Sequence, residues 1–264
     1  GVQTCALPIS TVSGSWRFVL TYNGEIYNGP ALRKELAGPG VTFRGHSDTE
    51  IMLAAIERWG LASAVQRFVG MFAFALWDRE QRTLHLVRDR LGIKPLYYAQ
   101  ADGGIYFGSE LRAVRPCLKT VEFDPQAVAA LLQVGFIPAP LSIYREIRKL
   151  MPGTILSVGA ANTNTTQYWS LREHARSAPA FAGTEQDAIE AAAALVQDSV
   201  QGCMVADVPT GVLLSGGIDS STVAAVAQSN SNTPVRTFSI GFDIAAFDEA
   251  PAAAAIAHHL GADH

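Results

Sequence analysis

Residues 209–228 read PTGVLLSGGIDSSTVAAVAQ, in which an apolar run, a glycine-rich turn and a helical segment follow one another directly. A second apolar run, VRTFSIGF, follows at 235–242, and an alanine-rich segment then extends through Ile256 to Leu260. The order strand, loop, helix, strand, helix is typical of a parallel sheet with helices on its faces. The C-terminal part is therefore predicted to be the start of an α/β domain.

The turn between the first strand and the first helix carries groups suited to a phosphate. Its glycines let the backbone approach an anion, and Ser215 and Ser220 offer hydroxyl groups. The helix that begins near Asp219 directs N–H groups and its positive dipole end at the same point. Asp219 would repel phosphates unless a divalent cation intervened, which makes it a candidate Mg²⁺ ligand. The alternative is a tight strand-to-helix turn with a Ser/Asp cap.

The N-terminal half predicts a different fold class. Its short runs of aromatic and β-branched residues are separated by turn-forming clusters, which is typical of antiparallel strands. These runs are MFAFALWD at 71–78, TLHLVRD at 83–89, PLYYAQ at 95–100 and GIYFGSE at 104–110. Since no long crossover helix separates them, we expect an α+β fold of layered antiparallel sheets.

The segment before these strands carries a polar motif. WRFVLTYNGEIYN at 16–28 predicts a strand that ends in a tight turn at Asn23-Gly24, because this dipeptide supports positive φ angles. A short helix is predicted at 30–36. Farther along the chain, the charged residues 88–94 predict a turn with internal ion pairs rather than a binding site.

Two helices have clear start signals. Ser47 with Glu50 three residues later predicts a capping box, and Asp48 lies where the helix dipole favours a carboxylate. Thr184 with Asp187 opens a second helix in the same way. We expect these residues to mark the beginnings of long helices.

Composition excludes several classes of protein. The 264 residues are 48% apolar, enough for a substantial core, and the net charge of −4 with no basic cluster argues against nucleic acid as a partner. No apolar run approaches the ~18 residues of a membrane span. The three cysteines are far apart and predict reduced thiols rather than disulfides or a zinc site. We therefore expect a cytoplasmic location and no membrane partner.

Changes of composition give the expected domain boundaries. Residues 1–10, GVQTCALPIS, resemble a translated sequencing adapter, and we treat them as a non-native leader. The first domain is expected at 11–169, where it ends soon after a polar run at 162–166. A Ser/Ala-rich linker at 170–183 precedes the second domain at 184–264.

The segment Ser215-Gly216-Gly217-Ile218-Asp219-Ser220 is similar to the SGGxDS pyrophosphate loop of the ATP pyrophosphatases, and the sequences at 238–242 and 247–249 resemble their asparagine synthetase branch. The resemblance implies ATP and Mg²⁺ as cofactors, with Asp219 on the metal. It implies an ATP site formed by Leu214, Ser215, Gly216, Gly217, Asp219, Ser220 and Ile240. Leu214 and Ile240 would hold adenine, although core packing explains an apolar strand residue equally well.

The N-terminal half independently resembles the class II glutamine amidotransferase domain, an Ntn-hydrolase-like glutaminase. The matching segments are 22–28, 47–50, 70–75 and 88–96. The resemblance implies an oxyanion hole formed by Asn23 and Gly24 and a glutamine site formed by Asn23, Gly24, Glu25 and Asp48. A dipole-favoured cap is the alternative explanation of Asp48.

Together the resemblances imply amidation of aspartate to asparagine with ammonia from glutamine, through a β-aspartyl-AMP intermediate. The catalytic N-terminal cysteine of class II amidotransferases has no counterpart, since Ala6-Leu7-Pro8 after Cys5 is unlike the family start. We therefore expect a fragment, truncated at both ends, without glutaminase activity.

Alternatives to this interpretation remain open. One is a related amidotransferase or β-lactam-type synthetase with another acceptor, and the other is a non-catalytic fragment. The expected partners are the small molecules glutamine, aspartate and ATP, and the parent enzyme could form a homodimer.

Overall fold

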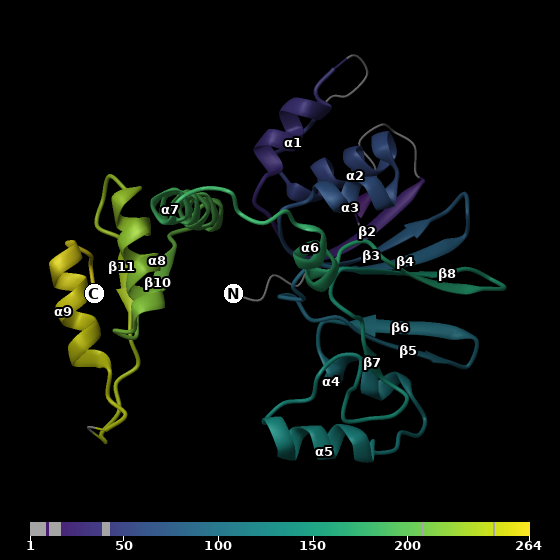
Figure 1. The fold of residues 1–264 in the computed structure, drawn as a ribbon. Helices are drawn as coiled ribbons and strands as arrows, with labels where there is room; N and C mark the ends of the chain where they lie inside the picture. The colour runs from purple at the N-terminus through teal and green to yellow at the C-terminus, as the bar shows by residue number, and fades with distance from the viewer. Residues whose placement is uncertain (1–8, 11–16, 39–42, 207, 245) are drawn as a thin grey trace. The chain divides into compact units, whose positions relative to one another are not determined.

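A computed structural model describes residues 9–10, 17–38, 43–206, 208–244 and 246–264. The chain forms two compact units, Gly1–Ala178 and Pro179–His264, each with a hydrophobic core of its own (Figure 1). Residues 1–8 of the expected leader lie outside the described residues. Its last two residues, Ile9 and Ser10, form the strand β1.

The N-terminal unit is built on a six-stranded antiparallel sheet with the order β1-β2-β3-β4-β8-β9. Its strands are β1 (Ile9–Ser10), β2 (Phe18–Ile26), β3 (Gly70–Asp78), β4 (Thr83–Arg88), β8 (Thr154–Val158) and β9 (Thr163–Gln167). The last of these comes from the polar run that composition placed at a domain edge. Its side chains are all exposed, so it is an edge strand without an apolar signal.

A second, three-stranded antiparallel sheet packs on one face of the first, and helices lie on both outer faces (Figure 1). The small sheet contains β5 (Tyr97–Ala101), β6 (Gly104–Gly108) and β7 (Arg148–Lys149) in the order β6-β5-β7. The helices are α1 (Gly29–Leu36), α2 (Asp48–Trp59), α3 (Leu61–Arg67), α4 (Leu111–Val114), the 3₁₀ turn η1 (Arg115–Cys117), α5 (Pro125–Val134) and α6 (Leu171–Ser177). The predicted α+β fold of layered antiparallel sheets is confirmed.

Strand β3 shows how the sequence sets these layers. Phe72, Phe74 and Leu76 belong to the core shared with α1, α2 and α3, whereas Ala73 and Ala75 belong to the core between the two sheets. Successive strand residues point to opposite faces, so the alternation of large and small side chains gives each layer its spacing. Both kinds of residue are almost fully buried.

The C-terminal unit begins with α7 (Glu185–Cys203) and continues through β10 (Gly211–Leu213), α8 (Ile218–Ser229), β11 (Arg236–Phe238) and α9 (Ala250–Leu260). The two strands are parallel, with Val212 opposite Thr237. The buried face of this pair packs on alanines of α8 and α9. The predicted start of an α/β domain is therefore confirmed.

Several helical segments were not predicted, namely α3, α4, α5 and α6. Helix α5 occupies a stretch where the prolines indicated only broken apolar pieces, and Pro125 stands at its first turn, where proline is tolerated. Helix α6 occupies the first half of the expected linker, with Ser170 as its N-cap. No helix among the described residues combines the length and the apolar character that a bilayer span requires.

Candidate functional site

Gly24 lies inside β2, where it faces the peptide between Met71 and Phe72. Its φ is +150°, and a Cβ at this position would lie 2.1 Å from the Met71 carbonyl oxygen and 2.7 Å from the Phe72 Cα. Only glycine can occupy such a position. The positive φ was predicted, but the tight turn was wrong: β2 continues in register to Ile26 because close contact with β3, not a chain reversal, requires the glycine.

The hydrogen-bond pattern of β3 shows where the Gly24 backbone points. Phe72, its register partner, donates its N–H to the Asp89 carboxylate (3.2 Å) and accepts the Asp89 N–H at its carbonyl (2.8 Å). Gly24 and Phe72 are therefore a pair without mutual hydrogen bonds, and the N–H of Gly24 points away from β3. We call this side of β2, including the N–H groups of Gly24 and Ile26, the outer edge.

Asp48 reaches the outer edge from the first turn of α2. Its Oδ2 accepts the N–H of Ile26 at 2.9 Å and the hydroxyl of Tyr22 at 3.4 Å. Burial, followed by the nearby Asp48 carboxylate, raises the pKa of the Tyr22 hydroxyl, so Tyr22 stays a neutral donor. Tyr22 was not predicted as part of the site, although strand alternation from Leu20 places it on the helix-facing side with Asp48.

Asn23 and Glu25 lie on the opposite face of β2 from Tyr22, toward the small sheet. The Asn23 Nδ2 donates to the hydroxyl of Ser109, at the end of β6, at 2.9 Å. The four residues expected to bind glutamine thus meet around one segment of β2. Asp48 and the backbone of Gly24 lie at its outer edge, while Asn23 and Glu25 approach from the inter-sheet face.

The predicted start of α2 is confirmed, but its capping box is wrong. Ser47 is the N-cap and accepts from the N–H of Thr49 at 3.3 Å. The Glu50 carboxylate does not return to Ser47. It accepts the N–H groups of Arg44 (2.6 Å) and Gly45 (3.0 Å), because the preceding chain folds over the first turn and presents those donors.

The charged turn at 88–94 was predicted to hold internal ion pairs, and this too is wrong. The Arg88 guanidinium donates to the carbonyls of Lys94 (2.8 Å), Gly92 (2.8 Å) and Leu150 (2.6 Å). Asp89 is 1% exposed. Its carboxylate accepts backbone N–H groups, those of Phe72, Leu91, Ile93 and Lys94. The side chains of Arg88 and Asp89 thus form hydrogen bonds with backbone groups that have no backbone partner. The spacing of charged residues in the sequence does not reveal such contacts.

The glycine-rich loop of the C-terminal unit joins β10 to α8. Gly216 has φ +83°, and a Cβ there would lie 3.0 Å from the Cβ of Ala252 in α9. Gly217 is the N-cap of α8, so the first N–H groups of the helix have no partner within it. The hydroxyls of Ser215 and Ser220 lie 3.0 Å apart, and the Ser220 hydroxyl also accepts the N–H of Ser215 at 3.3 Å.

Leu214 and Ile240 follow the adjacent strands β10 and β11 at the same end of the pair. The Leu214 side chain is 2% exposed within the core, its N–H donates to Phe238 O (2.8 Å), and its carbonyl accepts the Ser239 hydroxyl. Ile240 is 76% exposed. Core packing therefore explains the side chain of Leu214 but not that of Ile240.

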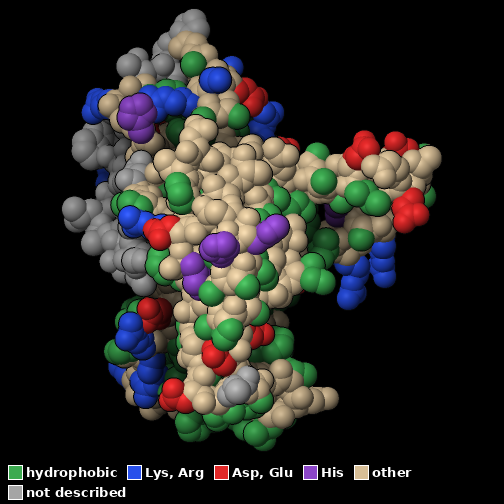
Figure 2. Space-filling model, turned by 90° about the vertical axis from the view of Figure 1, so that its left-hand side faces the viewer, with side chains coloured by type: hydrophobic (Ala, Val, Ile, Leu, Met, Phe, Trp, Pro, Cys, Tyr) green, Lys and Arg blue, Asp and Glu red, His purple; other side chains and the backbone are tan. Residues whose placement is uncertain are grey.

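Asp219 is exposed in the first turn of α8, where it immediately precedes Ser220 in the sequence. Oxygen donors of this kind suit Mg²⁺, with further ligands supplied by phosphate. Within the described ranges, no three His, Cys, Asp or Glu residues are grouped so as to hold a metal. Figure 2 shows several histidine side chains gathered on one face. The Nδ1 of His264, four residues after the end of α9, lies 2.9 Å from the Thr237 hydroxyl.

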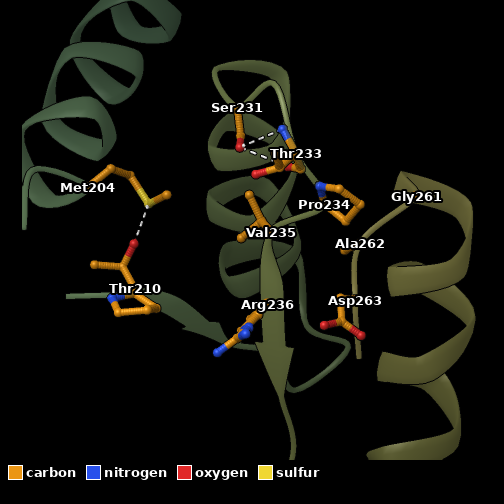
Figure 3. A pocket seen from close by; sticks show the side chains of 11 residues that line it. Met204, Thr210, Ser231, Thr233, Pro234, Val235, Arg236, Gly261, Ala262 and Asp263 are labelled. Carbon is orange, nitrogen blue, oxygen red and sulfur yellow. Dashed lines mark hydrogen bonds between the residues drawn. The ribbon is translucent and has the colours of Figure 1, made fainter.

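A hollow of about 670 Å³ lies at the other end of β10 and β11, between the end of α7 and the end of α9 (Figure 3). Thr210 and Arg236 line it at the starts of the two strands. Open α/β sheets bind their ligands at the carboxyl ends of the strands, where the glycine-rich loop lies. The hollow is therefore separate from the candidate phosphate site.

The family model of the glutamine amidotransferase domain matches residues 2–169. The chain belongs to this family. The model of asparagine synthase matches residues 191–264, which contain the glycine-rich loop. The two matches confirm the resemblance inferred from the motifs, in the same order along the chain.

Curated relatives of this chain include asparagine synthetase 1 (glutamine-hydrolyzing) of Bacillus subtilis, 34% identical over 93% of this chain and 38% of the relative. Asparagine synthetase B (glutamine-hydrolyzing) of Escherichia coli is 32% identical over 93% of this chain and 41% of the relative. The chain thus spans about two fifths of their length. A glutamine phosphoribosylpyrophosphate amidotransferase structure from B. subtilis matches 62% of this chain and 31% of its own, with TM-score 0.42 and 20% identity.

Proposed function

We propose that the N-terminal unit binds glutamine at the outer edge of β2. The observation that carries this proposal is the Asp48 carboxylate, which reaches the N–H of Ile26, two residues along the strand from Gly24. The N–H groups of Gly24 and Ile26 point the same way and are separated by about 7 Å along a strand. This spacing is comparable with the span of an extended glutamine from its side-chain amide to its ammonium group.

In this arrangement the ammonium group of glutamine pairs with Asp48, and its amide oxygen accepts from the N–H of Gly24 and the Nδ2 of Asn23. Glu25 would help to bind glutamine from the inter-sheet face of β2. Fixed, uncharged donors at the amide oxygen would stabilise the oxyanion that forms when the amide is attacked. Asn23 is held for this role by its bond to Ser109.

The glutamine site is tested by NMR titration of the chain with L-glutamine. We expect the amide signals of Gly24 and Ile26 to move in the wild type, and Asp48→Asn to weaken binding by at least about tenfold, because a charge-assisted bond is lost. Glu50→Gln is the matched control, since it alters another carboxylate of the same helix turn that accepts only Arg44 and Gly45 N–H groups. Equal binding by both variants would contradict the assignment.

We propose that the glycine-rich loop binds the phosphates of ATP, with Mg²⁺ held by Asp219. The support is the combination of Gly216 in a left-handed conformation, the free helix start after Gly217 and the adjacent hydroxyls of Ser215 and Ser220. The backbone at Leu214 and the exposed side chain of Ile240 would receive adenine. A bound Mg²⁺ would supply charge neutralisation for pyrophosphate as a leaving group.

Thermal unfolding of the C-terminal unit tests this site. Mg·ATP at 100 times its Kd should stabilise the unit by about 2.7 kcal/mol, and Asp219→Ala should reduce this shift. Asp198→Ala is the control, because Asp198 is an exposed carboxylate of α7 next to Gln197, which bonds to Asn230 at the far end of α8. An equal shift in wild type and Asp219→Ala would count against the metal site.

We infer that the whole protein performs glutamine-dependent amidation of a carboxylate, with aspartate as acceptor. ATP would convert the β-carboxylate to an acyl adenylate with release of pyrophosphate, and ammonia from glutamine would then displace AMP to give asparagine. The support is the order of the two family matches along the chain, together with the names of the curated relatives. Two separate sites would keep water from the adenylate while glutamine is cleaved elsewhere.

A further inference from the structure

Asp89 is a buried carboxylate for which the proposed function gives no role. Its Oδ2 accepts the N–H groups of Phe72 (3.2 Å) and Lys94 (2.9 Å), and its Oδ1 accepts those of Leu91 (3.1 Å) and Ile93 (3.0 Å). One side chain therefore ties the loop after β4 to a single point of β3. If β4 continued past Arg88, the backbone carbonyl of Asp89 would accept the N–H of Phe72. The Asp89 side chain accepts this N–H instead, so β4 ends at Arg88.

That point of β3 is the peptide on which Gly24 packs. The Met71–Phe72 peptide presents its carbonyl toward Gly24, where a Cβ would lie at 2.1 Å, and its N–H toward Asp89. A peptide unit is rigid and planar, so a shift of its N–H side also moves its carbonyl side. The position of Gly24 in β2 thus depends on a hydrogen bond made on the other side of β3.

We propose that Asp89 is a positioning residue for the Gly24 amide, which it aligns by anchoring the Met71–Phe72 peptide. This deepens the proposed function and rests on glutamine binding at the outer edge of β2. Donors to an oxyanion act only when they are fixed in direction, and such groups are commonly held by a second layer of buried hydrogen bonds. Asp89 does not touch the expected position of glutamine.

Arg88 holds the loop from the opposite side and keeps Asp89 from relaxing. Its guanidinium spans the carbonyls of Gly92, Lys94 and Leu150, and the Tyr168 hydroxyl donates to the Arg88 carbonyl at 2.8 Å. Burial lowers the pKa of Arg88, although the neighbouring Asp89 charge opposes this shift. These hydrogen bonds fix the loop that carries Asp89, so the Asp89 carboxylate cannot readily move with β3 if that strand shifts.

The first test compares Asp89→Asn with Asp78→Asn. A carboxamide has one acceptor oxygen, so its NH₂ group would face N–H donors that Asp89 now accepts. Asp78 is a matched control because it is also buried and accepts the N–H groups of the turn that follows β3. It lies in the same strand as Phe72 but six residues, or roughly 20 Å, away. We expect the Gly24 amide signal of the free protein to move in Asp89→Asn and to stay in place in Asp78→Asn. Equal movement in both variants would overturn the proposal.

Glutamine affinity gives the second readout. At similar losses of thermal stability, Asp89→Asn should bind glutamine about tenfold more weakly than Asp78→Asn, the effect of one misaligned hydrogen bond. Equal affinities would overturn the positioning role. If the wild type binds no glutamine, the proposed function fails, while the signal of Gly24 in the free variants still decides whether Asp89 sets its position.

A third measurement needs no variant and covers the case in which Asp89→Asn does not fold. Native-state hydrogen exchange of the wild type should show the amides of Phe72 and Lys94 opening together with those of Asn23 and Glu25, whose N–H groups face β3. Exchange of Phe72 and Lys94 while Asn23 and Glu25 stay protected would show that β2 does not depend on Asp89, and the proposal would be wrong.

Discussion

At the scale of single residues, buried aspartates fix the ends of strands in the N-terminal unit. Asp78 ends β3, where it accepts the N–H groups of Glu80 (2.9 Å) and Gln81 (3.1 Å) and pairs with Arg17 at 2.8 Å. Asp89 does the same after β4 with a larger set of donors. Each carboxylate replaces the strand partners that the backbone loses where it turns, which is why its burial is tolerated.

Asp78 makes the stability of the N-terminal unit dependent on pH. Burial alone would raise the pKa of this carboxyl, but the hydrogen bonds from Arg17 and the turn outweigh it and lower the pKa below its usual value. The unfolded chain therefore binds the proton more readily, so the stability from Asp78 is present above about pH 4 and is lost as the pH falls through the lowered pKa.

This prediction is checked by urea unfolding of the wild type and Asp78→Asn, followed by NMR signals of the N-terminal unit. At pH 7 the variant should be less stable by about 1–3 kcal/mol, since hydrogen bonds to a charged group are weakened. The difference should shrink as the pH is lowered below 4. A difference that is the same at both pH values would contradict the role of the ionised carboxylate.

At the scale of elements, periodicity predicted the strands and helices that carry one apolar face. It failed where structure follows from partners distant in the sequence. The polar strand β9 forms because it pairs with the edge of β8 through backbone hydrogen bonds. Asn23 and Gly24 remain in strand β2, and β3 lies too close to Gly24 for any side chain there. The sequence motifs supplied the residues of the proposed site, but did not point to Tyr22, Ser109 or Asp89, whose contacts span 26, 86 and 17 residues.

The N-cap of helix α7 allows a prediction of how much a local sequence signal contributes to stability. Its predicted cap is present as a capping box, in which the Asp187 N–H donates to the Thr184 hydroxyl at 3.2 Å and the Asp187 carboxylate accepts the Thr184 N–H at 2.8 Å. Most of this helix is exposed, so tertiary packing compensates little for a lost cap. Thr184→Ala should destabilise the C-terminal unit by about 1 kcal/mol.

Thermal unfolding followed by NMR signals of α7 and α8 measures this loss. Ser170→Ala, which removes the cap of α6 in the other unit, is the control and should leave those signals unchanged. An unchanged unfolding temperature in Thr184→Ala would show that the helix start is held by contacts other than its cap.

At the scale of the whole molecule, the chain consists of two separately packed cores joined by exposed residues. Residues 178–183 lie between α6 and the cap of α7, and Phe181 among them is 60% exposed. Proteases cut preferentially in exposed segments without regular structure. Brief treatment with chymotrypsin should therefore cleave first after Phe181 and give fragments 1–181 and 182–264.

Mass spectrometry of the early products identifies the cut. Phe181→Ser should abolish this cleavage and leave the chain intact for longer. A first cut at the exposed Phe123 or Phe242 would indicate that the boundary between the units is better protected than the loops within them.

The division into two units also has an optical consequence. All four tryptophans, Trp16, Trp59, Trp77 and Trp169, and all seven tyrosines precede residue 179, so the C-terminal unit contains neither chromophore. Intrinsic fluorescence therefore follows the unfolding of the N-terminal unit alone. A single tryptophan introduced near the glycine-rich loop would give the C-terminal unit a fluorescence signal that none of its own residues contributes.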